Sequence, residues 1–467
     1  MQSRNLALSS VAAATFLCAG AASAVTPDLT GYFRSGAGTN SQGGNIVCYR
    51  LPGSIVWFRL GNECDTYVAL TLGAELAKVD GTTFKAKFTT AQGTQGLANW
   101  EQSTPALREA YVEATDLGSA MKMPALNGAS LWAGKRFYKN PDIHMLDYSY
   151  WEPGMGPGFG LDNVNAGPGK LSYAMLRIGD FTGYGINTSL GGYSPDLIGG
   201  GSRTATVHDL RWQDLPVNPG GTATVGINLV RANNRGGTST YNKDETVLAD
   251  LDNNPATPPV SVLVRNTHTI DNKPGKNGVG LTFTHDQADL LGIAGKNTVG
   301  LQFAHNAAAL KGFGFAGSTD ERREWLLFDS WYIAPKGTAF SATSTVGYRN
   351  SKINDSTVKE MWIGTRPVYN LNNIWSLMAE VGHQQVRQDS QPTRKLSKVT
   401  LGTQFSMGPG VWARPAIRFY TTYAKWNDAA ANAGAVACSG RDCNTPSDGF
   451  TNKRSGVSYG VQVEAWF

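Results

Sequence analysis

The last twelve residues, GVSYGVQVEAWF, alternate between two kinds of side chain and end on an aromatic. One row is apolar or aromatic and contains Val457, Tyr459, Val461, Val463, Ala465 and Phe467. The other row is small or polar apart from one indole, and contains Ser458, Gly460, Gln462, Glu464 and Trp466. Because successive side chains of a β-strand point to opposite faces, this segment predicts a strand with one apolar and one polar face.

Strands of this kind recur along the chain. Alternating segments separated by Gly, Asn, Asp and Pro clusters include 67–76, 278–286, 298–305, 399–407 and 412–426. A terminal strand that ends on an aromatic is typical of bacterial outer-membrane β-barrels, in which apolar rows face lipid and polar rows face a wet lumen. At about ten residues per strand, the chain has room for between about 16 and 20 strands. The sequence therefore predicts an all-β, transmembrane antiparallel barrel with Trp466 in its lumen.

Composition excludes several other classes of protein. Hydrophobic residues make up 41% of the chain, and beyond the N-terminus there is no apolar run long enough for a membrane-spanning helix. The net charge is +5, with basic residues scattered among acidic ones, which does not suggest nucleic-acid binding. The chain has neither a GxSxG nor an HExxH motif. We therefore expect no catalytic residues, no metal site and no cofactor.

The N-terminus resembles a secretory signal peptide. Arg4 provides the charged region, residues 6–17 the apolar core, and Ala22-Ser23-Ala24 the small residues of a cleavage site. We expect residues 1–24 to be removed on export and residues 25–467 to form one barrel domain in the outer membrane of a Gram-negative bacterium. Cys18 suggests the alternative of a lipoprotein, although Leu17 stands where a small residue is needed.

Four cysteines remain after this segment: Cys48, Cys64, Cys438 and Cys443. An even number of cysteines in an exported chain favours disulfides. One bond between Cys438 and Cys443 would staple a loop tip, and one between Cys48 and Cys64 would close a loop near the first strands. A metal site is the alternative, but CxxC spacing and nearby histidines are missing.

The polar rows also contain unexpected aromatic side chains next to arginines. Strand alternation places these residues in the lumen: Tyr32, Arg34, Tyr67, Trp412, Arg414, Arg418 and Trp466. The same alternation places three apolar side chains against lipid: Val411, Ile417 and Phe419. The apolar face of a sugar ring can stack on an indole or phenol while its hydroxyls bind arginines and carboxylates. Alternatively, the aromatics fill the lumen or form interfacial girdles.

The chain resembles the maltoporin (LamB-type) sugar porins over nearly its whole length after the N-terminal segment. The resemblance is strongest in GYFRSG, FRLGNECDTY, LWAGKRFYKNPDIHMLDYSYWEPGMGPGFGLDN and WARPAIRFYTTYAKW, and in the closing VEAWF. It implies an 18-stranded barrel that assembles as a homotrimer with one sugar pathway per subunit. It also implies an inward-folded third loop, which corresponds to residues 139–169 and narrows the pore.

The resemblance also implies a binding track for maltodextrins. The family's aromatic track matches Tyr32, Tyr67, Trp412 and Trp466, and Trp100 matches the track residue that reaches in from a neighbouring subunit. The remaining track phenylalanine falls near Lys296, where no residue is assigned. The polar partners match Arg34, Arg59, Arg108, Asp142, His144 and Asp147.

Several constriction residues depart from the family pattern. Ala69 replaces an acidic partner, Asn140 replaces a basic residue, and Ser149 replaces the tyrosine at the narrowest point, although Tyr148 and Tyr150 flank it. A carboxylate is kept as Glu152. These differences resemble sucrose-type porins and predict a wider constriction that passes bulkier disaccharides.

The resemblance therefore implies a passive channel for maltose and maltodextrins, and for other disaccharides such as sucrose. A general, non-selective diffusion porin is the main alternative, but such a pore has no use for inward-facing Trp412 and Trp466. An outer-membrane glycoside hydrolase would use paired carboxylates among Asp142, Asp147 and Glu152. These acids are more simply explained as acceptors for sugar hydroxyls.

Overall fold

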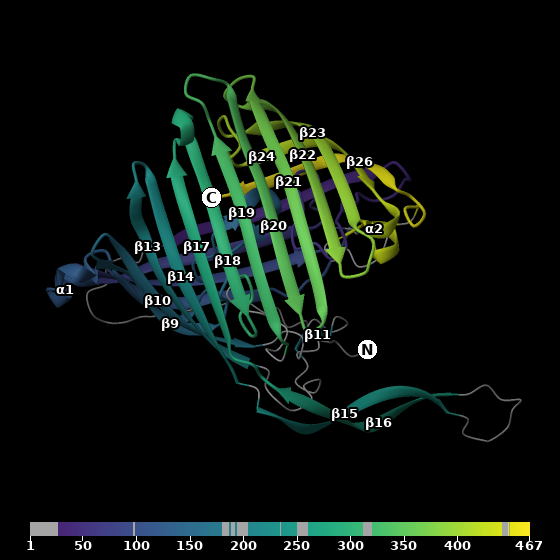
Figure 1. Ribbon diagram of the computed structural model, residues 1–467, viewed down its shortest axis with the longest axis horizontal. Helices are drawn as coiled ribbons and strands as arrows, with labels where there is room; N and C mark the ends of the chain where they lie inside the picture. Colours follow the sequence, from purple (N-terminus) through teal and green to yellow (C-terminus); the bar gives the residue numbers. More distant parts are fainter. Residues whose placement is uncertain are drawn as a thin grey trace, which may run out of the picture.

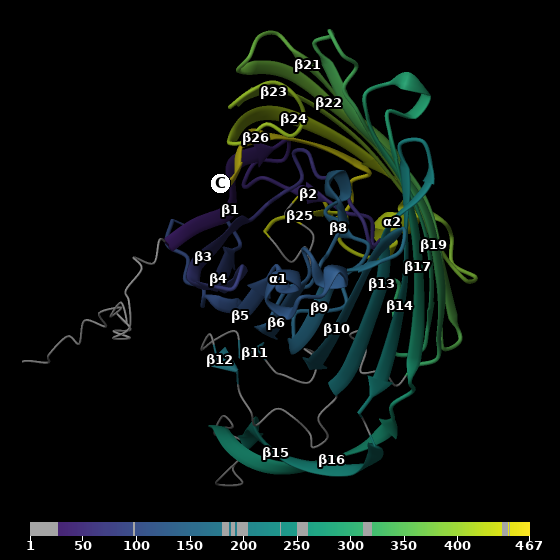
Figure 2. The same cartoon turned by 90° about the vertical axis from the view of Figure 1, so that its left-hand side faces the viewer.

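The fold is one closed antiparallel barrel of 18 strands, in which the last strand pairs with the first (Figures 1 and 2). The computed structural model describes residues 27–96, 99–179, 186–187, 192–193, 204–233, 235–249, 260–311, 320–440, 447 and 449–467. The predicted signal segment, residues 1–24, lies outside this part. Within it, none of the helices has the length and apolar composition needed to cross a bilayer. The closed ring of paired strands confirms the predicted all-β barrel.

The barrel strands follow one another in chain order: β1 (Pro27–Asn40), β3 (Thr66–Val79), β4 (Thr82–Thr94), β5 (Ala106–Thr115), β6 (Ser130–Lys135), β9 (Pro157–Ala166), β10 (Gly169–Gly179), β13 (Thr204–Asn218), β14 (Gly221–Ala232), β17 (Gly278–Ala288), β18 (Gly295–His305), β19 (Arg322–Ile333), β20 (Phe340–Ile353), β21 (Ser356–Asn370), β22 (Trp375–Gln388), β23 (Arg394–Ser406), β24 (Ala416–Trp426) and β26 (Ser455–Trp466). Each pairs with its neighbour in this order. The pairing of β26 with β1 closes the ring.

The remaining elements lie in the connections. The short strands are β2 (Cys48–Tyr49), β7 (Asp142–Ile143), β8 (Tyr148–Ser149), β11 (Ile186–Asn187), β12 (Gly192–Tyr193) and β25 (Ala437–Cys438). The helices are α1 (Leu117–Met121), η1 (Pro124–Leu126), η2 (His144–Leu146), η5 (Leu290–Gly292) and α2 (Asp428–Ala433). A long hairpin, β15 (Arg235–Ala249) with β16 (Val260–Pro274), projects beyond the barrel (Figures 1 and 2).

The two rims of the barrel differ in the length of their connections. Residues 80–81, 167–168 and 219–220 make tight turns at one rim. The other rim carries long connections such as 41–65 and 427–454. Outer-membrane barrels have short periplasmic turns and longer extracellular loops, so the tight turns mark the periplasmic rim.

The two faces of the barrel wall alternate as predicted. In β24 the outward Ile417 and Phe419 are 47% and 51% exposed, whereas Arg418 between them is 3% exposed. Val411, however, was wrongly predicted to face lipid. It is buried against Leu60, because residues 407–415 form a turn before β24 and strand alternation does not extend into it.

Two loops fold into the barrel and fill much of its interior (Figure 2). We call residues 41–65 the first loop and residues 136–156 the third loop. Their side chains, including Phe58 and Trp151, form a buried cluster with wall residues such as Trp362. The third loop is shorter than the predicted stretch 139–169, because Pro157–Ala166 is strand β9, which pairs with both β6 and β10.

Glycines in the wall make room for the first loop. Gly364 in β21 and Gly382 in β22 lie opposite each other in the sheet, and the ring of Phe58 covers both. A Cβ atom added at Gly382 would lie 2.1 Å from Cδ2 of Phe58. Phe58 can therefore lie flat on the wall only because these two positions have no side chain.

We expect Gly382→Ala to push the Phe58 ring off the wall and loosen the first loop, at a cost of about 1–3 kcal/mol for overpacking. Hydrogen–deuterium exchange of residues 54–62 should become faster. Gly73→Ala is the matched control, because a Cβ there meets its nearest atom at an ordinary 3.6 Å. Equal protection of the first loop in both variants would contradict this account of the packing.

Candidate functional site

A single buried carboxylate organises the interior of the barrel. Glu464 of β26 is 1% exposed and accepts hydrogen bonds from three guanidinium groups. The donors are Arg59 Nη2 at 2.8 Å, Arg414 Nε at 2.8 Å and Arg418 Nη1 at 2.8 Å. The Tyr32 hydroxyl also donates to it, at 3.1 Å. Such charge-assisted bonds fix the three cations, which come from the first loop, a periplasmic turn and β24.

A second ionic cluster adjoins the first. Arg34 of β1 donates to both carboxylate oxygens of Asp65, at 2.9 and 3.0 Å, and to Glu63 at 2.9 Å. Its guanidinium also lies 3.6 Å from Asp147 of the third loop. Burial alone would raise the pKa of Glu63, but the charges of Arg59 and Arg34 outweigh burial and hold that pKa below its usual range. Glu63 is therefore ionised and tied to both arginines.

Aromatic side chains form a continuous line beside these charges. Tyr32 and Tyr67 have ring centroids 6.0 Å apart, and Tyr32 lies directly opposite Trp466 in the pairing of β1 with β26. The His144 ring bridges Trp466, at 5.8 Å, and Trp412, at 5.2 Å. Trp412 and Trp466 remain 40% and 37% exposed. Their faces are thus accessible from inside the barrel.

The line continues to a residue that the sequence analysis missed. The Tyr332 ring of β19 lies 5.8 Å from that of Trp412. Lys296, near which the last track aromatic was left unassigned, pairs directly with Tyr332 across β18 and β19. Strand alternation in REWLLFDSWYI places Tyr332 on the same inward row as the buried Glu324, Leu326 and Phe328, and this pattern could have identified it.

His144 contributes an uncharged ring to the line. Arg59 Nη1 lies 3.0 Å from Nδ1 of His144, so the histidine can only accept this hydrogen bond. Burial and the nearby charge of Arg59 hold the pKa of His144 well below its usual value of about 6.5. At neutral pH the ring is therefore neutral.

The wall holds the first loop by its backbone. The Leu60 N–H donates to Glu380 Oε1 at 3.1 Å, and the Leu60 carbonyl accepts from Thr400 at 3.1 Å and from Lys398. The inward position of this loop was not predicted, because its contacts link residues more than 300 positions apart. It carries Arg59 and Glu63 into the centre of the barrel.

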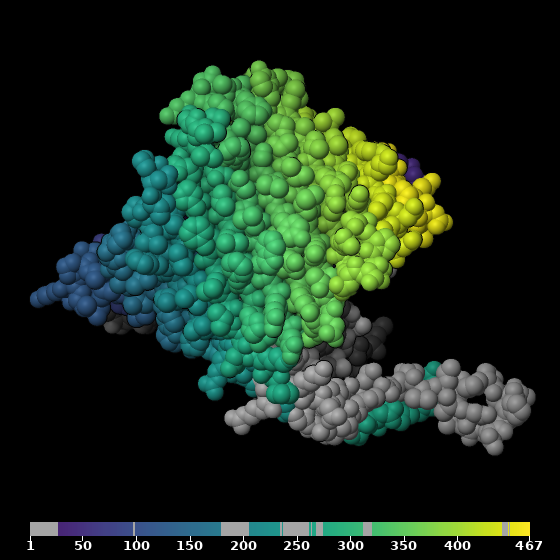
Figure 3. All heavy atoms as spheres, viewed as in Figure 1, coloured from purple at the N-terminus to yellow at the C-terminus, as the bar shows by residue number. Residues whose placement is uncertain are grey.

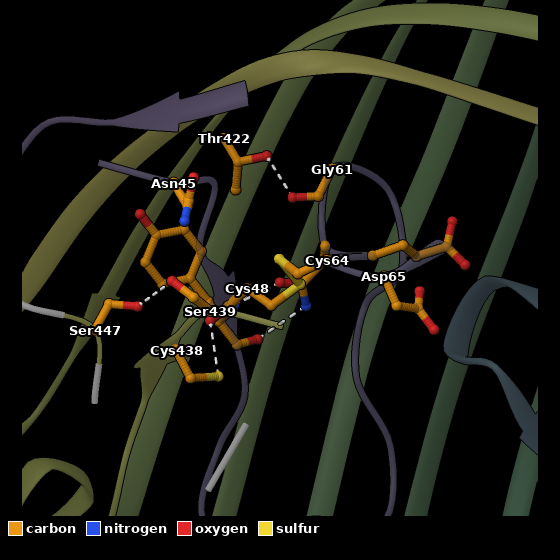
Figure 4. The surroundings of a disulfide bond; sticks show 12 residues. Asn45, Cys48, Gly61, Cys64, Asp65, Thr422, Cys438, Ser439 and Ser447 are labelled. Atoms are coloured by element: carbon orange, nitrogen blue, oxygen red, sulfur yellow. Dashed lines mark hydrogen bonds between the residues drawn. A yellow bond between two sulfur atoms is a disulfide. The ribbon is translucent and has the colours of Figure 1, made fainter. Parts of the chain in front are cut away.

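A disulfide closes the first loop. Cys48 and Cys64 are bonded, as predicted (Figure 4). Strand β2 of this loop pairs with β25, which places Cys438 beside Cys48. The predicted partner of Cys438, Cys443, lies outside the described residues.

The third loop is anchored on the opposite wall. The Trp151 indole N–H donates to Asp209 of β13 at 2.9 Å, and Gln302 of β18 donates to the Tyr150 carbonyl at 2.8 Å. The Arg59 backbone N–H donates to the Met145 carbonyl at 3.1 Å. The two inward loops therefore support each other and bring His144 to Arg59.

Other predicted residues lie apart from the aromatic line. Trp100, between β4 and β5, is 85% exposed. The Arg108 guanidinium lies over the ring of Phe137, 5.4 Å from its centroid. Glu152 forms an ion pair with Lys311 at 3.4 Å.

The predicted constriction residues lie on a small hairpin of the third loop. Asp142 in β7 lies directly opposite Ser149 in β8, and the half-buried Asn140 precedes this hairpin. The flanking Tyr148 is buried, and Tyr150 packs on Phe328 with centroids 4.7 Å apart. Neither tyrosine takes the place of the aromatic that Ser149 lacks.

Glu464 is another centre that sequence reasoning passed over. It lies two residues before Trp466 on the predicted polar row, so alternation alone placed it in the lumen. Its importance depends on Arg59, Arg414 and Arg418 converging on it from three segments. No pattern in the sequence shows this convergence.

Comparisons with known proteins identify the family of this chain. The family model described as LamB porin matches residues 28–467. Among solved structures, the chain is similar to OccK3 (OpdO) of Pseudomonas aeruginosa, with a TM-score of 0.43, 11% identity and 95% of each chain covered. It is also similar to the anion-selective porin of Comamonas acidovorans, with a TM-score of 0.42, 10% identity, and 94% of this chain and 99% of that chain covered. This chain belongs to the LamB porin family and is an outer-membrane channel of a Gram-negative bacterium.

Proposed function

We propose that this channel carries sugars by passive, facilitated diffusion, with maltose and maltodextrins as its main class of substrate. The observation that carries the proposal is the placement of Trp412 and Trp466. Both indoles are partly exposed inside the barrel and lie beside a cluster of arginines and carboxylates. An aqueous pore for ions alone has no need of exposed indoles there.

The chemistry of a pyranose matches this arrangement. One face of the ring is rich in C–H groups and can stack on Trp466, Tyr32 or Trp412, while hydroxyls at its edge reach charged groups. Arg34 and Asp147 are partly exposed beside Tyr67 and offer a strong donor and a strong acceptor. The remaining proposed polar contacts come from Arg59, Arg108, Asn140, Asp142, His144, Ser149 and Glu152.

Transport requires that binding be weak at each step. A channel must bind its substrate well enough to admit it but not so well that it cannot leave, which favours several similar sites in series. The line from Tyr67 through Tyr32, Trp466 and Trp412 to Tyr332 provides such a series. Sugar can thus move from one ring to the next.

The constriction suggests a broader substrate range that includes sucrose. Ser149 presents only a hydroxymethyl group, and the neighbouring Tyr148 and Tyr150 are packed into the loop. We infer a passage wide enough for bulkier or branched disaccharides. We also propose a homotrimer, because the highly exposed Trp100 suits a contact with a neighbouring subunit.

Trp412→Ala and Trp466→Ala should weaken the block of single-channel current by maltodextrins. Loss of a stacking face is worth roughly 1–3 kcal/mol in the related case of bases on aromatics, so we expect about a tenfold lower affinity for each variant. Titration of maltohexaose against single-channel current in a planar bilayer measures this affinity.

Trp331→Ala is the matched control for both variants. Trp331 precedes Tyr332 on β19 and points to the outside of the barrel, on the row of Leu327 and Asp329. Its loss should leave the block unchanged. If sugars fail to block the wild-type current at all, the channel is a general diffusion porin and the proposal is wrong.

Ser149→Tyr should restore a phenol at the narrowest point. We expect a lower single-channel conductance and a larger loss of sucrose passage than of maltose passage. Ser149→Ala, which leaves the space open, should behave like the wild type. Liposome swelling in each sugar gives the relative rates, and an unchanged sucrose-to-maltose ratio in Ser149→Tyr would remove Ser149 from the selectivity mechanism.

Sugar block should show no midpoint near pH 6.5, because burial and the charge of Arg59 hold the pKa of His144 well below that value and keep its ring neutral there. Below about pH 6.5 the His144 side chain binds a proton in the unfolded chain but not in the folded chain. Acid therefore lowers the free energy of unfolding through this residue. Current titrations at several pH values test the absence of a midpoint. A midpoint of sugar affinity near pH 6.5 would show that His144 titrates normally.

A further inference from the structure

Basic residues gather on the outside of the barrel at its extracellular rim. Six consecutive strands, β19 to β24, each carry one outward-facing, exposed cation within four residues of the extracellular end. We call these six residues the basic belt: Arg323, Lys352, Lys359, Arg387, Lys395 and Lys425. The outer wall of β19 to β22 is turned toward the viewer in Figure 3.

Ion pairing within the protein does not account for the belt. In the described part of the chain, none of the six side chains lies within ion-pair distance of a carboxylate. Two pairs of these cations lie directly opposite each other in the sheet, Arg323 with Lys352 and Lys359 with Arg387, and like charges in such positions are destabilising. Their persistence on one surface points to anions from outside the protein.

The belt is confined to one rim of the barrel, and outside its arc the outward-facing Arg177 of β10 and Arg231 of β14 are further exposed cations near that rim. At the periplasmic ends of the same strands the outward positions hold apolar and aromatic residues, such as Ile333, Phe340, Tyr369 and Trp375. The outward rows of β26, β1 and β3 carry neither lysine nor arginine. The belt is therefore not a general property of the strand ends.

A groove of about 450 Å³ lies at one end of the belt. Its upper part is basic, because Arg323 pairs directly with His305 on one side and with Lys352 on the other. Its lower part is apolar, with Phe303 opposite Trp325 one step toward the middle of the membrane. Cations thus stand directly above an aromatic floor.

We propose that this groove and the basic belt bind a phosphorylated glycolipid of the outer leaflet, the chemistry of lipopolysaccharide. Arg323 and Lys352 hold a phosphate on its saccharide head, since basic side chains near a membrane surface attract anionic lipid heads. An acyl chain lies along Phe303 and Trp325. A soluble phosphate would use the cations but not the apolar floor, whereas a lipid uses both.

The double variant Arg323→Gln/Lys352→Gln tests the proposal in the purified full-length protein. Lipopolysaccharide is titrated into delipidated protein in detergent, and bound lipid is counted by native mass spectrometry. We expect a fall in affinity of roughly tenfold or more, as for two basic residues that each face an anionic membrane surface. Lys122→Gln/Lys336→Gln removes the same charge at the periplasmic rim and should bind like the wild type.

Two further probes separate the sources of the phosphate. Dephosphorylated lipopolysaccharide should bind the wild type as weakly as intact lipid binds Arg323→Gln/Lys352→Gln, and inorganic phosphate should not compete at millimolar concentration. Single-channel conductance of the variant should equal that of the wild type, which confirms that the barrel is folded. Equal lipid affinity in the variant and the wild type, or full competition by inorganic phosphate, would overturn the proposal.

Discussion

Closure of the sheet between β1 and β26 is the constraint on which the rest of the structure depends. A membrane-spanning strand finds no hydrogen-bond partner in lipid, so the first and last strands must pair with each other. Their register places Tyr32 opposite Trp466 and Arg34 opposite Glu464. Residues from the two ends of the chain thereby become neighbours on the inner wall. The aromatic line begins at this seam.

The charged groups inside the barrel hold the two inward loops in place and also line the interior. Glu464 gathers arginines from the first loop, the turn before β24 and β24 itself, while Arg34 links the first strand to both inward loops. A buried carboxylate is costly unless it is paired and hydrogen-bonded, and here every partner also lines the interior. The contacts that hold the loops in place therefore also arrange the polar groups beside the aromatic rings.

The outside of the barrel faces lipid instead of water, and this determines its side chains. Outward rows are predominantly apolar through the membrane, and on β19 to β24 they carry lysine and arginine only near the extracellular rim. The arc of β26, β1 and β3 lacks them. This asymmetry shows that the wall has distinct sectors around its circumference. The charge at the extracellular strand ends therefore differs between parts of the wall that have the same strand architecture.

Sequence reasoning succeeded where the two-residue period applies and failed where it stops. Tyr32, Tyr67 and Trp466 lie within strands, so alternation predicted their direction correctly. Val411 lies in a turn, where the period has no meaning, and its predicted exposure to lipid was wrong. The third loop was predicted too long, because the glycine-rich sequence of β9 looks like a loop until its partners β6 and β10 are known.

The sequence alone determined the barrel class and which rows face inward, because lipid on one side and water on the other impose a local pattern on every strand. Only the tertiary structure decided that the first loop enters the barrel and that three arginines meet at Glu464. It alone placed Tyr332 at the end of the aromatic line. These features depend on contacts between residues hundreds of positions apart, which closure of the sheet creates and which leave no periodic trace in the chain.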